Sequence, residues 1–407
     1  ESNYSFDKES NYSFDKESNY SFDKDPILQC NYLKNFKNNI IPFEKQDNVM
    51  ITGATGFLGA YLVRDLLKIK EKLYCLVRCK YAEIGLKRIR ENMEKYKLWK
   101  SEYENRLIIV PGDLQLEFFG LSSENYNILC KTIDVIYHNA AMVNYITNYN
   151  AHRLTNVIGT FNIIKLATSI KLKKINFIST IAVFGPYFYF TGVNIINENT
   201  SLDTSVTALK YDMGYSQSKW VAEKLLLSFS SLGLPLSIFR PGFIMGDSIT
   251  GCSNTDDFMH SLIKGCIHSY SYPLLHSQRK EFVPVDYVSS VISFISSSPS
   301  SSSLCFHIVP PSSSSSPDII STFNSLSLLG YHLSPLDYSS WVNSLISSSS
   351  PSLSPFLSLF YTPILNNLSV WQLYTHMSLY DSSNTSLFLS SSSISFSSFS
   401  SLLPLYF

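Results

Sequence analysis

Six short apolar runs recur along the first 240 residues of the chain. They are rich in β-branched and aromatic residues, which is typical of buried strands, and they occupy residues 48–52, 72–77, 106–110, 134–138, 175–180 and 236–240. The segments between the runs place apolar residues at helical spacing, as in "LGAYLVRDLLK" and "GTFNIIKLATSI". This alternation predicts an α/β fold, in which helices cover both faces of a doubly wound parallel sheet.

After about residue 247 the apolar pattern loosens, and serine takes over the polar positions. "ISTFNSLSLLGY" and "SSWVNSLI" still keep helical spacing, so this part is predicted to fold. We therefore predict a first domain at 47–246 and a smaller, mainly helical, serine-rich region at 247–407. Residues 282–310 are expected to return to the first domain.

The N-terminal residues 1–24 repeat the octapeptide "ESNYSFDK" three times. Three copies of a polar octamer cannot build a core, so we predict that this segment is disordered. A short lead-in of linker or helix is expected at 25–46. Because the chain does not begin with Met, we also expect it to be part of a longer polypeptide.

The charge balance excludes some functions. Lys plus Arg equals Asp plus Glu at 32 each, which gives no reason to expect a nucleic-acid partner. The stretch 281–407 has no Lys or Arg and contains five acidic residues. Serines interrupt the uncharged stretch 382–407 throughout, so no membrane span is expected there. The seven scattered cysteines form no CxxC pair, which predicts reduced thiols in a cytoplasmic protein and no metal site.

The first apolar run leads into "ITGATGFLG", a glycine-rich turn that opens a helix. Residues without a β-carbon let the backbone approach a pyrophosphate closely, and the free N–H groups of a helix N-terminus favour negative charge. The turn therefore predicts a dinucleotide site in a Rossmann-like domain. Its cofactor-binding residues are expected to be Gly53, Thr55, Gly56, Phe57, Leu58 and Gly59.

Two arginines follow the second run. Arg78 lies where enzymes selective for NAD usually carry an acidic residue that holds the ribose hydroxyls, whereas an arginine accommodates a 2′-phosphate. Arg88, on the next helix, could supply a second cation. Together they favour NADPH over NADH as the cofactor.

The ends of the third and fourth runs complete the expected cofactor site. Asp113 and Leu114, in "GDL", would lie near the adenine. Asn139, Ala140 and Ala141, in "HNAAMVN", follow the fourth run, and the small alanines would let the cofactor pass close to the backbone. All these residues lie at carboxyl ends of strands, the expected ligand edge of such a sheet.

The candidate catalytic residues are Thr180, Tyr215 and Lys219. Thr180 ends the fifth run at the same edge, and "GYSQSKW" places Tyr215 and Lys219 four residues apart, on one face of a helix. A phenol can act as an acid–base near neutral pH when a cation stabilises its phenolate. Lys219 would supply that cation and also bind the nicotinamide ribose, while Thr180 would fix the substrate oxygen.

These motifs resemble those of an extended short-chain dehydrogenase/reductase. "HNAAMVNY", "NVIGT", "GYSQSKWVAE", "RPGFIMGDSITG" and "FVPVDYV" narrow the resemblance to thioester reductase domains, which end some polyketide synthases, nonribosomal peptide synthetases and carboxylic acid or aminoadipate reductases. The likeness covers about residues 47–310. It implies NADPH-dependent reductive release of an acyl thioester, bound to a carrier protein's phosphopantetheine, as an aldehyde and then an alcohol. By this resemblance, 47–246 is the NADP-binding domain and 247–407 the substrate-binding region.

Three other interpretations remain open at this point. A fatty acyl-CoA reductase would share the fold, the cofactor and the Tyr–Lys pair. A sugar-nucleotide epimerase would retain NAD, and Arg78 argues against it. An NAD(P)-sensing regulator on an inactive scaffold is expected to lose Tyr215 or Lys219, and both residues are present.

Overall fold

Seven parallel strands form the central sheet of the computed structural model, which describes residues 21–25, 27, 46–311, 316–348, 351 and 353–407. The strands in sheet order are β11 (Leu304–Ile308), β7 (Leu236–Pro241), β5 (Lys174–Ile178), β4 (Val135–His138), β1 (Val49–Thr52), β2 (Leu73–Val77) and β3 (Leu107–Pro111). The predicted doubly wound parallel sheet is thus confirmed. The strand order reverses beside β1, and ligands of such sheets bind at this reversal.

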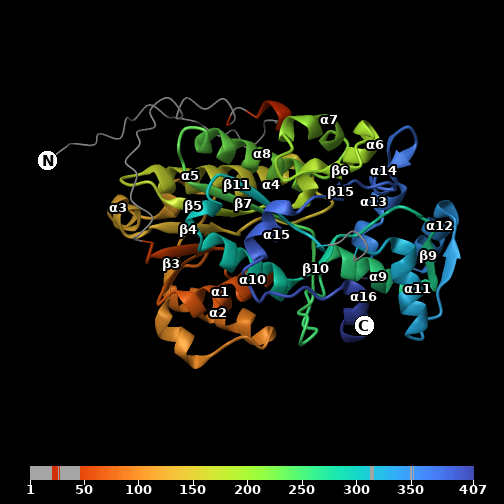
Figure 1. The fold of residues 1–407 in the computed structure, drawn as a ribbon, viewed down its shortest axis with the longest axis horizontal. Coiled ribbons are helices and arrows are strands. Elements are labelled where there is room, and N and C mark those ends of the chain that lie inside the picture. The colour runs from red at the N-terminus through yellow and green to blue at the C-terminus, as the bar shows by residue number, and fades with distance from the viewer. Residues whose placement is uncertain (1–20, 26, 28–45, 312–315, 349–350, 352) are drawn as a thin grey trace.

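Helices cover both faces of the sheet, as Figure 1 shows. One face carries α1 (Phe57–Ile69), α2 (Ala82–Lys95) and α10 (Val285–Ser296). The other carries α3 (Ser123–Thr132), α4 (Tyr149–Arg153), α5 (Gly159–Thr168) and α8 (Gly214–Ser230), with a π-helical turn at Leu154–Ile158 between α4 and α5. The alternation along β1 explains the two layers, because Val49 and Ile51 pack toward α1 and Met50 toward the opposite helices.

The serine-rich region packs around its own core at one end of the sheet (Figure 1). Its helices are α9 (Phe258–His268), α11 (Ile319–Leu328), α12 (Tyr338–Ser348), α13 (Ser358–Tyr361), α14 (Val370–Leu373) and α16 (Phe399–Tyr406). Aromatic rings dominate the core: Trp341 is fully buried, and its ring lies 5.1 Å from that of Phe360. Serine therefore surfaces a folded region.

Among the described residues, four pairs of short strands and several short helical turns lie outside the central sheet. The pairs are β8 (Phe243–Met245) with β10 (Phe282–Pro284), β9 (Ser271–Pro273) with β12 (Ser334–Leu336), β13 (Pro363–Leu365) with β14 (Leu368–Ser369), and β6 (Ile195–Ile196) with β15 (Leu379–Tyr380). The short helices are α6 (Tyr187–Thr191) and α7 (Val206–Leu209), with 3₁₀ turns at Ser101–Arg106, Glu117–Gly120, Ile181–Phe184, Leu202–Ser205, Pro299–Ser301 and Ser354–Phe356.

Two later segments return to the sheet. Strand β11 pairs with β7, so residues 304–308 add a seventh strand to the six expected from the apolar runs. Helix α15 (Ser383–Leu389) then packs on β11, with the Phe388 ring 5.2 Å from that of Phe306. The sequence did not indicate this second return.

The predicted disorder of residues 1–24 is wrong at its C-terminal end. Phe22 begins a 3₁₀ helix at Phe22–Lys24, is buried, and packs its ring edge-on against Trp220 at 5.6 Å. The buried carboxylate of Asp25 accepts bonds from Arg153 at 2.6 and 2.9 Å and from the Tyr149 hydroxyl. Residues 1–20, and 28–45 of the lead-in, lie outside the described residues.

None of the helices described here is long and apolar enough to cross a bilayer. Across the same residues, no group of three or more His, Cys, Asp and Glu side chains could hold a metal ion.

Candidate active site

One cavity of about 750 Å³ lies along the carboxyl edge of the sheet. Residues that directly follow β1, β2, β3, β4, β5 and β7 all contribute to its wall. Every predicted site residue except Gly59 lines it: Gly53, Thr55, Gly56, Phe57, Leu58, Arg78, Arg88, Asp113, Leu114, Asn139, Ala140, Ala141, Thr180, Tyr215 and Lys219. The structure therefore brings the two predicted groups, cofactor-binding and catalytic, to one cavity.

The glycine turn has no room for side chains at two of its positions. Gly53 has φ +74°, and a Cβ there would lie 2.8 Å from the backbone of Ala140. A Cβ on Gly59 would lie 2.0 Å from the carbonyl oxygen of Gly53. Gly59 thus lets α1 pack directly on the turn, which explains why it is needed although it lies behind the cavity wall.

This turn fits a dinucleotide pyrophosphate. Gly56 is the N-cap of α1 and faces the cavity together with Phe57 and Leu58. The first N–H groups of a helix have no partner within the helix, and the helix dipole adds positive potential there. The cavity therefore presents backbone donors at a point where no Cβ blocks close approach.

The two predicted arginines lie together at the β2 end of the cavity. Nη1 of Arg88 donates to the carbonyl oxygen of Arg78 over 2.6 Å, which fixes one side chain against the other residue's backbone. Both are exposed, and neither forms an ion pair with a carboxylate of the described residues. Their charges are therefore available to an anionic ligand.

A buried chain of hydrogen bonds fixes the end of β4 beside the glycine turn. Thr52 Oγ1 lies 2.9 Å from His138 Nδ1 and accepts a bond from the Ala140 N–H at 3.0 Å, and Asn139 Nδ2 donates to the Gly53 carbonyl at 3.2 Å. Burial lowers the pKa of His138 to about 3, so the imidazole is neutral and serves as a bridge. The alanines predicted to flank the cofactor are thereby held in place.

The three candidate catalytic residues lie on β5's continuation and on α8. Thr180 Oγ1 accepts a bond from the Ala182 N–H at 3.1 Å, which leaves the hydroxyl proton free to donate. Tyr215 and Lys219 occupy one face of the first turns of α8. Lys219 Nζ donates to the Ile178 carbonyl at 2.7 Å, directly before the Thr180 loop.

Burial opposes charge on both members of the Tyr–Lys pair. It raises the pKa of Tyr215 above its ordinary value and lowers the pKa of Lys219 to about 7, against the opposing field of Glu223. A phenolate and an ammonium formed side by side would stabilise each other. The two groups are therefore suited to a reaction in which Tyr215 gives a proton to a substrate while the Lys219 ammonium stabilises the phenolate that forms.

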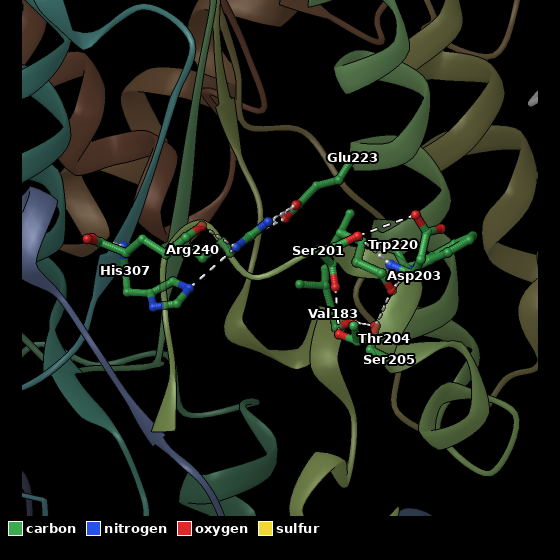
Figure 2. Close-up of polar contacts among 11 residues, drawn as sticks. Val183, Ser201, Asp203, Thr204, Ser205, Trp220, Glu223, Arg240 and His307 are labelled. Carbon is green, nitrogen blue, oxygen red and sulfur yellow. Dashed lines mark hydrogen bonds and ion pairs between the residues drawn. The ribbon is translucent and has the colours of Figure 1, made fainter. Parts of the chain in front are cut away.

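Two buried polar contacts hold α8 against neighbouring segments, and Figure 2 shows their side chains. Arg240 reaches from β7 to Glu223, one turn after Lys219, with Nη2 to Oε2 at 2.7 Å and both side chains inaccessible. Its Nη1 lies 3.4 Å from His307 Nε2 on β11. The next contact is Trp220, whose Nε1 donates to the Leu202 carbonyl at 2.9 Å. These bonds set the rotation of α8 about its axis and thereby direct Tyr215 and Lys219 toward the cavity.

Sequence reasoning missed Asn156, which lies in the π-helical turn between α4 and α5. Its amide bonds both backbone groups of Met142, at 2.7 and 3.0 Å, and donates to Ser218 Oγ at 2.8 Å. It thus connects the segment after β4 with α8, the helix that carries Tyr215 and Lys219. The signal was present in "NVIGT", a buried asparagine among apolar helix residues.

The far end of the cavity is built by other residues that the sequence did not indicate. Most of its lining is aromatic or aliphatic: Tyr145, Met213, Phe243, Phe258, Leu359, Val370, Trp371, Tyr374, Met377 and Tyr380. Two charged residues join them, Asp257 and Lys280. Asp257 caps α9 by accepting from the Met259 N–H at 2.8 Å, and burial raises its pKa to about 6.

The family described as "Male sterility protein" matches residues 51–292 of the chain. The structure is also similar to that of the terminal R domain from the myxalamid PKS-NRPS biosynthetic pathway, with a TM-score of 0.82, 35% identity and 91% of each chain covered. The chain belongs to the family of reductase domains that includes this R domain. The predicted membership among thioester reductase domains with the extended short-chain dehydrogenase/reductase fold is confirmed.

Two curated relatives come from Aspergillus flavus. The nonribosomal peptide synthetase asaC is 39% identical over 345 residues, which are 84% of this chain and 34% of that protein. The aldehyde reductase lnbA is 41% identical over 313 residues, 76% of this chain and 31% of that protein. The chain thus spans about a third of the length of these relatives. An oxidoreductase that uses a nicotinamide cofactor agrees with the family and with the cavity.

Proposed function

We propose that this domain uses NADPH to reduce an acyl thioester, carried on the phosphopantetheine arm of a carrier protein, to an aldehyde. The observation that carries the proposal is the single cavity in which Thr180, Tyr215 and Lys219 lie between the glycine turn and an apolar end. Relatives named as a nonribosomal peptide synthetase and an aldehyde reductase support the substrate class. We expect the domain to work in the cytoplasm within a larger synthase.

The preference for NADPH rests on Arg78 and Arg88. Both guanidinium groups line the cavity where β2 ends, and no carboxylate occupies the position after β2. A 2′-phosphate would receive two cations there, whereas NADH would place an uncharged 2′-hydroxyl at this position. When bound, NADPH would supply a hydride to the carbonyl carbon of the thioester.

Three residues of the chain would bind and protonate the carbonyl oxygen of the thioester. Thr180, whose oxygen already accepts from the Ala182 N–H, would donate a hydrogen bond from its hydroxyl to the carbonyl oxygen and orient the carbonyl. Tyr215 gives its proton to that oxygen as negative charge develops, and the ammonium of Lys219 stabilises the resulting phenolate. The product of this step is a neutral hemithioacetal.

Collapse of the hemithioacetal completes the release. The C–S bond breaks and its electron pair leaves with the sulfur as a thiolate, while the hydroxyl proton returns to the phenolate of Tyr215. The thiolate then takes a proton from water and becomes the carrier's thiol. The carbon that lost sulfur becomes an aldehyde. A second reduction at the same three residues would give the alcohol.

Product analysis tests this proposal directly. The protein is incubated with NADPH and matched acyl-pantetheine, acyl-CoA and acyl-carrier thioesters, and mass spectrometry identifies the products. We expect aldehyde or alcohol together with free thiol, and the highest kcat/KM on the carrier. Equal kcat/KM on acyl-CoA would favour a fatty acyl-CoA reductase, and absence of thiol release from every thioester would refute the proposal.

A further inference from the structure

Lys280 is a buried cation at the apolar end of the cavity. Only 1% of its surface is exposed, and it lines the cavity two residues before β10. It is also the last Lys or Arg in the sequence, so the 127 residues that follow, 281–407, add no Lys or Arg to this end. The other Lys and Arg side chains on the wall are Arg78, Arg88 and Lys219, and each lies at the cofactor or catalytic part.

Two aromatic rings hold the Lys280 ammonium. Nζ lies 4.0 Å from the ring centroid of Trp371 and 5.2 Å from that of Phe243, and both rings line the cavity as well. Trp371 comes from α14 and Phe243 from β8, so the ammonium lies where the C-terminal region meets the β8–β10 pair. The rings offset part of the cost of burial through cation–π attraction, which leaves the N–H donors unused.

No carboxylate compensates this charge. Across the described residues, Lys280 forms no ion pair or side-chain hydrogen bond, although Asp257 lines the same end of the cavity. Burial alone lowers the pKa of Lys280 to about 7, without a contribution from any acidic group. A lysine that is buried, unpaired and in the wall of a cavity is costly for folding alone, and a bound anion would offset that cost.

We propose that Lys280 binds a carboxylate on the acyl chain of the substrate, remote from the thioester. This inference rests on the proposed function and makes it more specific. The cavity encloses the ammonium among aromatic side chains, where a charge-assisted hydrogen bond is stronger than in water. Acyl chains with a free carboxylate would therefore be preferred over neutral chains of the same length.

The experiment compares acyl-pantetheines in matched pairs. Succinyl, glutaryl, adipoyl and suberoyl thioesters are each paired with the corresponding methyl ester, so that length stays constant and charge is removed. The variants are Lys280→Met, which keeps the chain volume, and Lys264→Met, a control at an exposed lysine on α9. In the best pair, we expect Lys280→Met to lower the preference for the carboxylate, measured as a ratio of kcat/KM values, by about 10- to 100-fold.

Two further variants and probes identify the source of the anion. Lys280→Arg keeps the charge and should restore part of the preference. Hexanoyl-pantetheine and hexanoyl-4′-phosphopantetheine differ only in the phosphate of the arm. If the loss in Lys280→Met follows that phosphate and not the acyl carboxylate, the arm is the ligand and the proposal is wrong.

Failure of the inference is distinguishable from failure of the proposed function. If the methyl esters and hexanoyl-pantetheine are reduced and Lys280→Met changes no ratio, Lys280 is only structural, and thioester reduction stands. If no thioester is reduced, the proposed function fails. Calorimetric binding of the four ω-carboxyacyl-pantetheines then tests Lys280 alone, because Lys280→Met should weaken the tightest of them at least tenfold while Lys264→Met should not.

Discussion

The two ends of the cavity are built in different ways. At the cofactor end the wall is largely backbone and short polar groups, placed by the turns that follow the parallel strands, as at Gly53 and Ala140. At the other end the wall consists of large side chains from the C-terminal region, such as Trp371 and Tyr374. Backbone at strand ends suits a ligand that does not vary, whereas side chains can be exchanged to suit another substrate.

The same contrast appears in how each region is stabilised. The sheet domain contains buried ion pairs, Arg240 with Glu223 and Arg153 with Asp25. Within 281–407 no Lys or Arg exists to form such pairs, and aromatic contacts like that of Trp341 with Phe360 dominate the core. The apolar end of the cavity therefore depends on shape and apolar packing, with Asp257 and Lys280 as its charged residues.

The largest expected effect is the loss of the catalytic acid. Tyr215→Phe should lower kcat/KM for thioester reduction by about 10²- to 10⁴-fold, because the oxygen of the substrate is no longer protonated. NADPH binding, measured by its fluorescence, should not change, since the phenol is not part of the glycine turn. Tyr211→Phe, which removes a hydroxyl from a residue stacked on Phe190, is the matched control and should keep activity. Full activity of Tyr215→Phe would exclude it as the acid.

The next largest effect distinguishes stabilisation by a buried ion pair in the sheet domain from stabilisation by aromatic packing in the C-terminal region. Asp25→Asn should lower the free energy of unfolding by about 3–5 kcal/mol, because the buried guanidinium of Arg153 would lose the carboxylate that accepts two of its hydrogen bonds. Trp341→Ala should lower it by about 3–5 kcal/mol through lost packing in the C-terminal core. Both are measured by urea unfolding.

The controls for this pair follow from the same contacts. Asp23→Asn removes a longer pair, 3.6 Å, with the exposed ammonium of Lys210 and should cost about 0–1 kcal/mol. The double change Asp25→Asn with Arg153→Met should recover part of the loss, since the guanidinium that lost its carboxylate is removed as well. A loss as small for Asp25→Asn as for Asp23→Asn would mean that the N-terminal contact does not stabilise the domain.

Residues near strand ends were predictable from sequence, and residues brought together by packing were not. Gly53, Asn139 and Thr180 follow apolar runs, and parallel strands bring their carboxyl ends to one edge whatever the details of the core. Tyr215 and Lys219 share a helix, so their spacing fixes their common face. The glycine motif does not show which glycines line the cavity, because Gly59 packs against the turn and lies outside the cavity wall.

Lys280 and Phe22 could not be placed from the sequence. Lys280 becomes part of the site because Trp371, 91 residues later, folds back onto it, and no local pattern encodes that contact. Phe22 belongs to a polar repeat of the same composition as the copies before it, yet a pocket beside Trp220 buries it. Both depend on contacts between distant parts of the chain.

A smaller effect tests the cofactor end. Arg78→Ser should raise the ratio of KM for NADPH to KM for NADH by about 10- to 100-fold, because a charge-assisted bond to the 2′-phosphate is lost. Arg88→Ser should give a smaller increase, since Arg88 also bonds the Arg78 carbonyl. Lys87→Ser, on the same helix and paired with Glu91, is the control. Equal changes of KM for both cofactors would remove Arg78 from the phosphate site.

The smallest effect is the dependence of reduction on pH. Burial holds the pKa of Lys219 at about 7, so its ammonium form predominates below pH 7 and is lost above it. The pKa of Tyr215 is raised, so the phenol keeps its proton throughout this range. Reduction needs both protons, and kcat/KM, which reports the free enzyme, should be level below pH 7 and fall about tenfold per pH unit above it. A level profile to pH 9 would mean that reduction does not require the positive charge of Lys219. Another cation would then have to stabilise the phenolate of Tyr215.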